Sequence, residues 1–261
     1  MIFETHAHYD DEKFDVDRVE LLSHLLRSNN IGNIVNIGAS FRGCKDSLDL
    51  ATSYPNVYAA IGIHPENIDE INDDVMDWLR INASNPKVVA IGEIGLDYYW
   101  VKEDEQRAKQ RLWFQRQMDL AKEVDLPVVI HSRDAAEDTL NTIMSYNTQG
   151  VRGIVHCYSY SKEIAAQYVQ MGWYIGVGGV VTFKNGRKLV ETVESIPLES
   201  IVLETDCPYM APEPHRGERN SSIYLSHIAA KIAEIKGISV KEVEDVTYAN
   251  ALKIYTKAKR N

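Results

Sequence analysis

The chain of 261 residues carries 28 basic and 38 acidic side chains, a formal net charge of −10, and 44% of its residues are hydrophobic. This composition is typical of a folded globular protein rather than a disordered one. The acidic excess argues against a protein that coats nucleic acid through bulk positive charge. The negative charge does not exclude an enzyme that binds a few phosphate groups at one local site.

We expect neither a transmembrane segment nor a signal peptide. No apolar stretch is long enough to span a bilayer, and the first residues show neither the basic nor the apolar segment of a signal peptide. The three cysteines, Cys44, Cys157 and Cys207, are an odd number without the spacing of a zinc ribbon, which fits a reducing compartment. We therefore expect a cytoplasmic protein that does not contact a membrane.

Short β-branched runs alternate with amphipathic stretches along the chain. Continuous apolar runs are typical of strands that are covered on both faces. They predict eight strands, at residues 1–3, 34–37, 57–63, 88–92, 128–130, 153–155, 174–177 and 201–203. Helical periodicity predicts helices at residues 15–28, 105–124, 135–146, 161–171, 185–193, 221–235 and 241–258.

Eight alternations of strand and helix favour an α/β fold, a (β/α)₈ barrel of the TIM type that forms a single domain over residues 1–261. An open doubly wound sheet is the alternative, since it fits the periodicity almost as well. In a barrel, side chains at the carboxyl ends of the strands converge on one mouth, which is the active face.

Histidines and carboxylates follow six of the predicted strands. His6 and His8 are two residues apart, so both side chains point the same way from an extended strand. Any one of these histidines could be an ordinary buried residue, but several of them at the ends of different strands favour a shared site. The residues that would meet at the mouth are His6, His8, His64, Glu93, His131, His156, Glu204 and Asp206.

Imidazole and carboxylate groups without cysteine suit Zn²⁺, Mn²⁺ or Mg²⁺. The number of candidate ligands exceeds one tetrahedral site and fits two divalent ions that share a bridging carboxylate. Such a site can hydrolyse a phosphoester, an amide or a lactone. The sequence has no P-loop, no dinucleotide-binding glycine motif and no nucleophile elbow, so we expect no organic cofactor.

Seven ordered motifs carry a resemblance to a known family. They are ETHAHYD (4–10), IGIHP (61–65), GEIGLDYY (92–99), HSR (131–133), HCYS (156–159), ETDCPY (204–209) and PHRGERN (214–220). Their order and spacing resemble the TatD family of metal-dependent deoxyribonucleases, within the amidohydrolase-like barrels. The resemblance covers nearly the whole chain, from Thr5 to Asn250. It implies a TIM-type barrel with two divalent ions at its mouth.

The resemblance also implies a ligand set. One ion would be held by His6, His8, Glu93 and Asp206, and the other by Glu93, His131 and His156, with Glu93 bridging. No lysine stands on the fourth strand, which favours a TatD-like site over related amidohydrolases that use a carboxylated lysine. Cys207 departs from the pattern, because a small residue such as serine is expected after the metal-binding aspartate.

The implied activity is hydrolysis of DNA phosphodiester bonds, as a 3′–5′ exonuclease on single-stranded ends. Asp206 and Glu93 would be the catalytic residues, with Asp206 as the acceptor of the proton of a metal-activated water; the alternative for Asp206 is a ligand only. Glu204 would orient a histidine, since ligating imidazoles usually donate their other N–H to an acceptor. Asp97 and Arg133 would position the substrate or support Glu93 and His131.

Substrate contacts are predicted around the mouth. Arg216, Arg219 and Asn220 follow the last strand in a loop region that often binds phosphate in barrels, and guanidinium groups suit phosphate oxygens. The alternative is that these arginines pair with acidic surface residues. His64 would contact a phosphate or form part of the rim. Residues 98–100 are aromatic and would stack on bases or simply pack.

Two other functions stay open. The same metal scaffold permits hydrolysis of a carboxyl ester, a lactone or an amide, such as an aminoacyl-tRNA ester. A metal-stabilised binding protein without activity is disfavoured, because no candidate ligand is replaced by an apolar residue. The expected partner is single-stranded DNA, and a monomer is compatible with the sequence.

Overall fold

The computed structural model describes residues 1–28 and 30–260. In these residues, eight parallel strands lie in the order β1 to β8. Their bounds are Ile2–Ala7 (β1), Ile31–Ile37 (β2), Val57–Ile61 (β3), Val88–Asp97 (β4), Val128–Arg133 (β5), Gly153–Val155 (β6), Tyr174–Val177 (β7) and Ile201–Leu203 (β8). A bridge between Ala7 and Cys207 brings the two ends of the sheet together. The predicted (β/α)₈ barrel is confirmed, and the open sheet is excluded.

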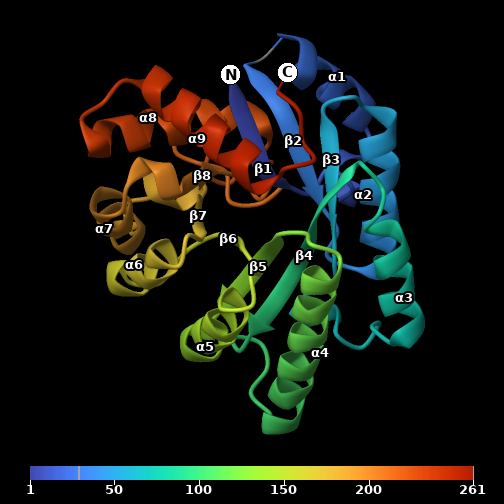
Figure 1. Ribbon diagram of the computed structural model, residues 1–261. Helices are drawn as coiled ribbons and strands as arrows, with labels where there is room; N and C mark the ends of the chain where they lie inside the picture. Colours follow the sequence, from blue (N-terminus) through green and yellow to red (C-terminus); the bar gives the residue numbers. More distant parts are fainter. Residues whose placement is uncertain (29, 261) are drawn as a thin grey trace.

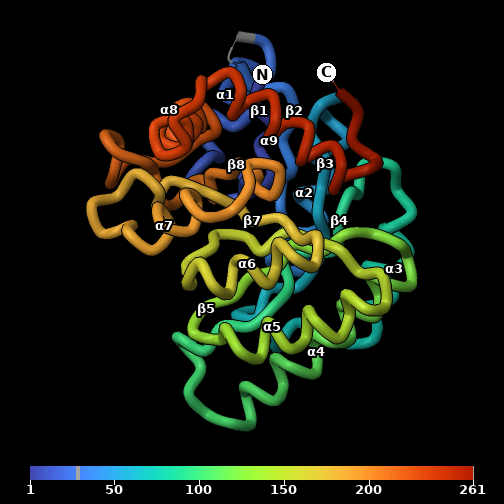
Figure 2. Tube along the Cα trace, turned by 60° about the vertical axis from the view of Figure 1, so that its left-hand side comes forward, coloured from blue at the N-terminus to red at the C-terminus, as the bar shows by residue number. Residues whose placement is uncertain are grey.

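Helices surround the strands (Figures 1 and 2). They are Arg18–Ser28 (α1), Phe41–Ser53 (α2), Asp73–Asn82 (α3), Asp104–Glu123 (α4), Ala136–Asn147 (α5), Lys162–Gln170 (α6), Arg187–Ser195 (α7), Leu225–Lys236 (α8) and Val240–Ile254 (α9). None of the helices in the described part of the chain is both long and apolar enough to cross a membrane.

The sequence did not predict α2 and α3. The buried face of α2 is built from small residues, including Gly43, Cys44 and Ala51, so it lacks the stripe of large apolar side chains that marks a helix in sequence. Its beginning is instead fixed by Ser40, whose side chain accepts a hydrogen bond from the Gly43 N–H. The helix α3 buries only three residues. The side chain of Asn72, which precedes it, caps its first turn in the same manner.

The core has two apolar clusters on the two sides of the sheet. Val35 and Ile37 point into the barrel, whereas Ile34, the residue before Val35, joins the cluster that the outer helices cover. Tyr255, at the end of α9, belongs to the inner cluster, and Asn250 of α9 donates to the carbonyl of Ile201 at the start of β8. The amino ends of the strands are therefore closed by apolar packing, which leaves the carboxyl ends for polar side chains.

A buried carboxylate joins the first and last strands. Glu4 accepts hydrogen bonds from the Thr205 N–H at 2.9 Å, the Thr205 hydroxyl at 2.7 Å and the Ser222 hydroxyl at 2.9 Å. Burial raises the pKa of Glu4 to about 8, although these hydrogen bonds act in the opposite direction. The network fixes the segment after β8 against β1, and this segment carries Asp206.

Candidate metal centre

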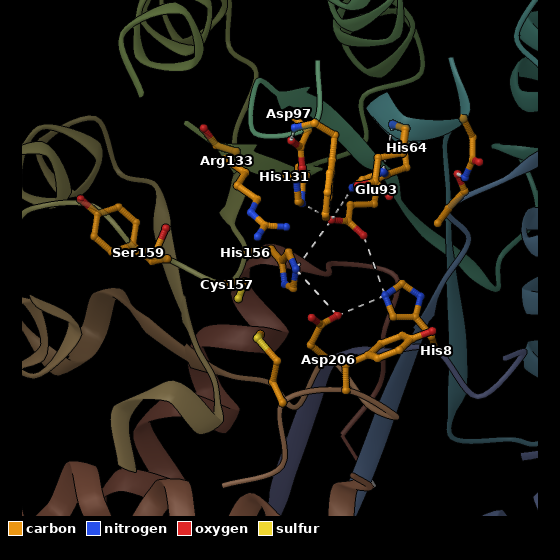
Figure 3. A pocket seen from close by; sticks show the side chains of 18 of the residues that line it. His8, His64, Glu93, Asp97, His131, Arg133, His156, Cys157, Ser159 and Asp206 are labelled. Carbon is orange, nitrogen blue, oxygen red and sulfur yellow. Dashed lines mark hydrogen bonds and ion pairs between the residues drawn. The ribbon is translucent and has the colours of Figure 1, made fainter. Parts of the chain in front are cut away.

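A cavity of about 870 Å³ opens at the carboxyl ends of the strands. Its lining includes side chains from within β4 and β5 and from the segments after β1, β3, β6 and β8, the six strands at which the sequence places histidines and carboxylates (Figure 3). Parallel strands bring their carboxyl ends to one face of a barrel, so residues far apart in the sequence meet here. The cavity is therefore the candidate site.

His6 and His8 come from the end of β1, and their Nε2 atoms lie 3.1 Å apart. His8 Nδ1 lies 2.8 Å from the Ile37 carbonyl. Because a carbonyl oxygen can only accept, Nδ1 carries a proton, and Nε2 is the atom that faces the site and would bind a metal ion in place of a proton. This hydrogen bond is the usual way in which a protein sets the tautomer of a metal-binding histidine.

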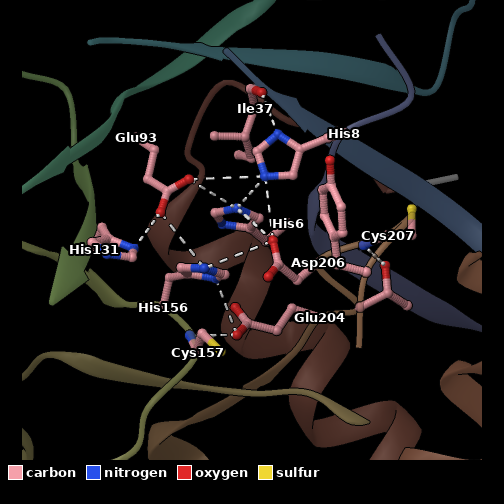
Figure 4. Close-up of polar contacts among 12 residues, drawn as sticks. His6, His8, Ile37, Glu93, His131, His156, Cys157, Glu204, Asp206 and Cys207 are labelled. Atoms are coloured by element: carbon pink, nitrogen blue, oxygen red, sulfur yellow. Dashed lines mark hydrogen bonds and ion pairs between the residues drawn. The ribbon is translucent and has the colours of Figure 1, made fainter. Parts of the chain in front are cut away.

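Glu93 lies at the centre of the cluster, with its two oxygens directed to two groups of histidines (Figure 4). Oε2 lies 3.4 Å from His6 Nε2 and 3.8 Å from His8 Nε2. Oε1 lies 3.0 Å from His131 Nδ1 and 3.6 Å from His156 Nε2. A carboxylate in this position can be shared by two cations.

Asp206 completes the cluster from the segment after β8. Its backbone is left-handed, with φ of 58°, a conformation that aspartate tolerates better than most residues. Oδ1 lies 3.3 Å from His8 Nε2, 3.7 Å from His6 Nε2 and 3.9 Å from His156 Nε2. Within the described residues, three overlapping sets of donor atoms are close enough to hold a metal ion: His6, His156 and Asp206; His6, His8 and Glu93; His64, Glu93 and His131.

The charges of the cluster favour a cation. Burial alone would raise the pKa of Glu93, but the surrounding histidines outweigh it and hold the pKa well below its usual value. Burial would likewise lower the pKa of each histidine, yet the carboxylates raise that of His8 to about 10 and those of His131 and His156 to about 9. Divalent ions compete with protons for such ligands, and the donor set of nitrogen and oxygen suits Zn²⁺, Mn²⁺ or Mg²⁺.

His64 adjoins the cluster from the loop after β3. Its Nε2 lies 3.6 Å from Glu93 Oε1, and its ring centroid lies 4.2 Å from that of His131. Burial, together with the neighbouring His131, lowers the pKa of His64 to about 3, so the ring is neutral. Its Nδ1 accepts a hydrogen bond from the Glu66 N–H, which places the remaining proton on Nε2. In this arrangement His64 presents a donor to the cavity, and a ligand role would require the other tautomer.

Two further carboxylates support the histidines from behind. Glu204 Oε1 lies 3.2 Å from His156 Nδ1 and accepts the Cys157 N–H at 2.6 Å. Asp97 Oδ2 lies 3.1 Å from His131 Nε2. Both placements suit the roles that the sequence suggests, in which a carboxylate orients the ring of a histidine.

The two arginines expected to bind substrate lie away from the cavity. Arg219 forms a two-pronged ion pair with Asp17, at 2.8 Å and 2.5 Å, next to the start of α1. The Arg216 guanidinium packs over the ring of Phe183 at 4.4 Å. Neither side chain lines the cavity. These Arg219 contacts match the alternative given in the sequence analysis, in which the arginine pairs with an acidic surface residue.

Asn220 holds its own loop and has no exposed surface. Its side-chain N–H groups donate to the carbonyls of Thr205 at 2.9 Å and Tyr209 at 2.6 Å. This burial corrects the expectation of a substrate contact, because a buried amide with two backbone partners cannot reach a ligand in the cavity. Cys207 is also fully buried and does not line the cavity, so its thiol faces away from the site (Figure 4).

Three carboxylates that the sequence analysis did not single out also line the cavity: Asp10, Asp11 and Glu66. Asp10 stands two residues beyond His8, so the spacing that links His6 to His8 continues to it. Glu66 follows His64 by two residues in the short helix Pro65–Asn67. The side of the cavity next to β1 and β3 is therefore acidic.

Comparisons with known proteins show which family the chain resembles. A family model described as TatD related DNase matches residues 3–256. The uncharacterized metal-dependent hydrolase YabD of Bacillus subtilis is 37% identical over 255 residues, which cover 98% of this chain and 99% of the relative. The uncharacterized metal-dependent hydrolase TatD of Mycobacterium tuberculosis is 32% identical over 244 residues, 92% of each chain. The crystal structure of YjjV, a TatD homologue from Escherichia coli K12, aligns with a TM-score of 0.90 and 29% identity over 98% of each chain. This chain belongs to the TatD family of metal-dependent hydrolases.

Proposed function

We propose that this protein hydrolyses phosphodiester bonds at single-stranded DNA ends, in the 3′ to 5′ direction, with two divalent ions. The observation that carries the proposal is the position of Glu93 between two groups of histidines, because a carboxylate in this position can bridge two ions and hold them side by side. The first ion would be held by His6, His8, Glu93 and Asp206, and the second by Glu93, His131 and His156. The match to a family model described as TatD related DNase supports DNA as the substrate.

The divalent ions would supply an activated water and would neutralise charge on the phosphate during hydrolysis. Asp206 is the candidate acceptor for the proton of that water. Its side chain is 20% exposed, against 5% for Glu93, so Asp206 can pass a proton on to solvent. Although burial alone would raise its pKa, hydrogen bonding with His8 keeps the pKa of Asp206 below its usual value, so the carboxylate is ionised at neutral pH. Glu93, buried among histidines, would hold its charge and position both ions.

The size of the cavity limits what can enter. Its volume of about 870 Å³ lies within the range of sites that hold small molecules, roughly 300–1,000 Å³. A terminal nucleotide with its neighbour fits this range, and a continuous duplex does not.

The three cysteines are free, as expected for an enzyme of the reducing cytoplasm.

A second candidate is hydrolysis of a neutral carboxyl ester or lactone. The acidic side of the cavity, with Asp10, Asp11 and Glu66, favours an uncharged substrate over a polyanion. Arg219 and Asn220 bind other residues and do not line the cavity. They therefore do not support the sequence-based expectation that the loop after β8 binds phosphate. The two functions differ in the charge of the substrate, so one experiment separates them.

The test is cleavage of end-labelled single-stranded DNA by metal-stripped protein after Mg²⁺, Mn²⁺ or Zn²⁺ is restored. Stepwise shortening from the 3′ end that needs metal and disappears in Glu93→Ala and Asp206→Ala supports the proposal. A useful control is Glu191→Ala, which changes an exposed carboxylate on α7 that pairs with Arg187. Failure of the wild-type protein to cleave DNA while it binds two ions and hydrolyses a lactone would establish the second candidate.

A further inference from the structure

The wall of the cavity at the end of β5 carries an arginine. Arg133, at the end of β5, is the one lysine or arginine among the described residues that line the cavity. Its guanidinium points into the cavity on the side of His156 (Figure 3). Asp10, Asp11 and Glu66 lie after β1 and β3. Arg133 and these three carboxylates therefore come from different strand ends of the cavity wall.

Arg133 is held by packing and not by a carboxylate. Its guanidinium carbon lies 3.8 Å from the centroid of the Tyr99 ring and 5.7 Å from that of Trp100. Arg219, by contrast, is neutralised by Asp17. No carboxylate among the described residues forms an ion pair with Arg133. Stacking on a ring fixes the plane of a guanidinium and leaves its N–H groups free to donate.

We propose that Arg133 binds a non-bridging phosphate oxygen of the substrate and thereby selects phosphate-containing substrates in this cavity. The inference rests on the proposed function and names the residue that gives it specificity. Metal ions alone activate water for esters, amides and phosphoesters alike. A planar fork of N–H donors matches the oxygens of a phosphate.

The surroundings of Arg133 also limit how many phosphates are recognised. Arg133 is the one arginine in a lining that also holds Asp10, Asp11 and Glu66, so it favours one phosphodiester near the strand end over further phosphates that would pass these carboxylates. Binding should consequently depend only weakly on salt, because few counterions are released when one phosphate is held.

The test compares Arg133→Gln with Arg107→Gln in the metal-loaded protein. Arg107 is a matched control, because its guanidinium stacks on the Tyr98 ring at 4.6 Å but does not line the cavity. The measurements are KM and kcat for a short single-stranded oligonucleotide, and competition by thymidine 5′-monophosphate and by thymidine. We expect Arg133→Gln to raise KM and to weaken monophosphate binding by at least about ten-fold, with a smaller effect on kcat. Arg107→Gln should match the wild type, and thymidine should compete equally in all three proteins.

The outcomes separate this inference from the proposed function. Equal monophosphate binding by wild type and Arg133→Gln overturns the phosphate contact even if the wild type degrades DNA. Equal weakening of thymidine and thymidine monophosphate also overturns it, since a phosphate contact cannot affect a ligand without phosphate. A wild type that binds the monophosphate through Arg133 but cleaves no DNA supports the contact and refutes the nuclease function. Arg133→Lys should restore little, because lysine keeps the charge and loses the planar fork.

Discussion

His156 and Glu204 are paired below the candidate metal centre, with Nδ1 of the histidine 3.2 Å from Oε1 of the glutamate and both side chains almost fully buried. The same oxygen accepts the Cys157 N–H at 2.6 Å. Gly176 of β7 makes room for this carboxylate, since a Cβ at position 176 would overlap Glu204. Three neighbouring strands thus contribute to the orientation of one imidazole, whose Nε2 faces Glu93.

Glu204→Gln should weaken metal binding without unfolding the barrel. The amide keeps an oxygen for the Cys157 N–H but loses the charge that orients and polarises His156, and loss of such a partner typically costs about 10–100-fold in metal affinity. Competition with a chelator measures the change, and excess metal should restore activity. Gly176→Ala should act in the same direction by displacing the carboxylate. Gly178→Ala is the control, because its Cβ would make only an ordinary contact with Glu204. Wild-type metal affinity in both Glu204→Gln and Gly176→Ala would contradict this account.

Asp206→Asn should separate proton transfer from metal binding. Asparagine retains an oxygen toward His8 but cannot accept a proton, so kcat should fall by roughly 10²–10⁴-fold at saturating metal. Metal content is measured on the same samples. Asp245→Asn provides a control outside the cavity, because Asp245 forms an exposed ion pair with Lys241 on α9. If Asp206→Asn keeps full activity with both ions bound, Asp206 is a ligand only.

The barrel and the histidine cluster could be predicted because both depend on short-range patterns. Continuous apolar runs mark buried parallel strands, and a spacing of two residues places His6 and His8 on the same face. Other features depend on distant partners. Arg219 pairs with Asp17, 202 residues away, and no local pattern distinguishes such an arginine from one that binds phosphate. The helix α2 was missed because its inner face is made of small residues such as Gly43.

The ion pair between Arg219 and Asp17 should contribute to stability and not to catalysis. Both side chains are about one-third exposed, at 33% and 35%, and the contact is two-pronged. Exposed pairs contribute about 0.2–1 kcal/mol, and we expect a coupling energy near the upper end of that range. A double-mutant cycle of Arg219→Ala and Asp17→Ala in urea unfolding measures it. KM for an oligonucleotide should stay at the wild-type value in Arg219→Ala. A rise in KM of ten-fold or more would show that Arg219 contacts the substrate.

Glu4 should make the protein less stable as the pH rises. Its pKa is about 8 in the fold, against a usual 4.5, with burial as the main cause. Between these values the folded chain keeps a proton that the unfolded chain has lost, so the free energy of unfolding falls as pH increases through this window. The slope is at most about 1.4 kcal/mol per pH unit, and it disappears above pH 8 because both states are then ionised.

Glu4→Gln should remove this dependence, since glutamine keeps an oxygen for the Thr205 N–H and does not titrate. The measurement is urea unfolding of wild type and variant from pH 5 to 8, in which the difference between the two curves isolates Glu4 from the histidines that both proteins share. Glu12→Gln, at an exposed position, is the control and should parallel the wild type. Parallel curves for wild type and Glu4→Gln would instead show that the donors from Thr205 and Ser222 stabilise the ionised carboxylate enough to offset its burial.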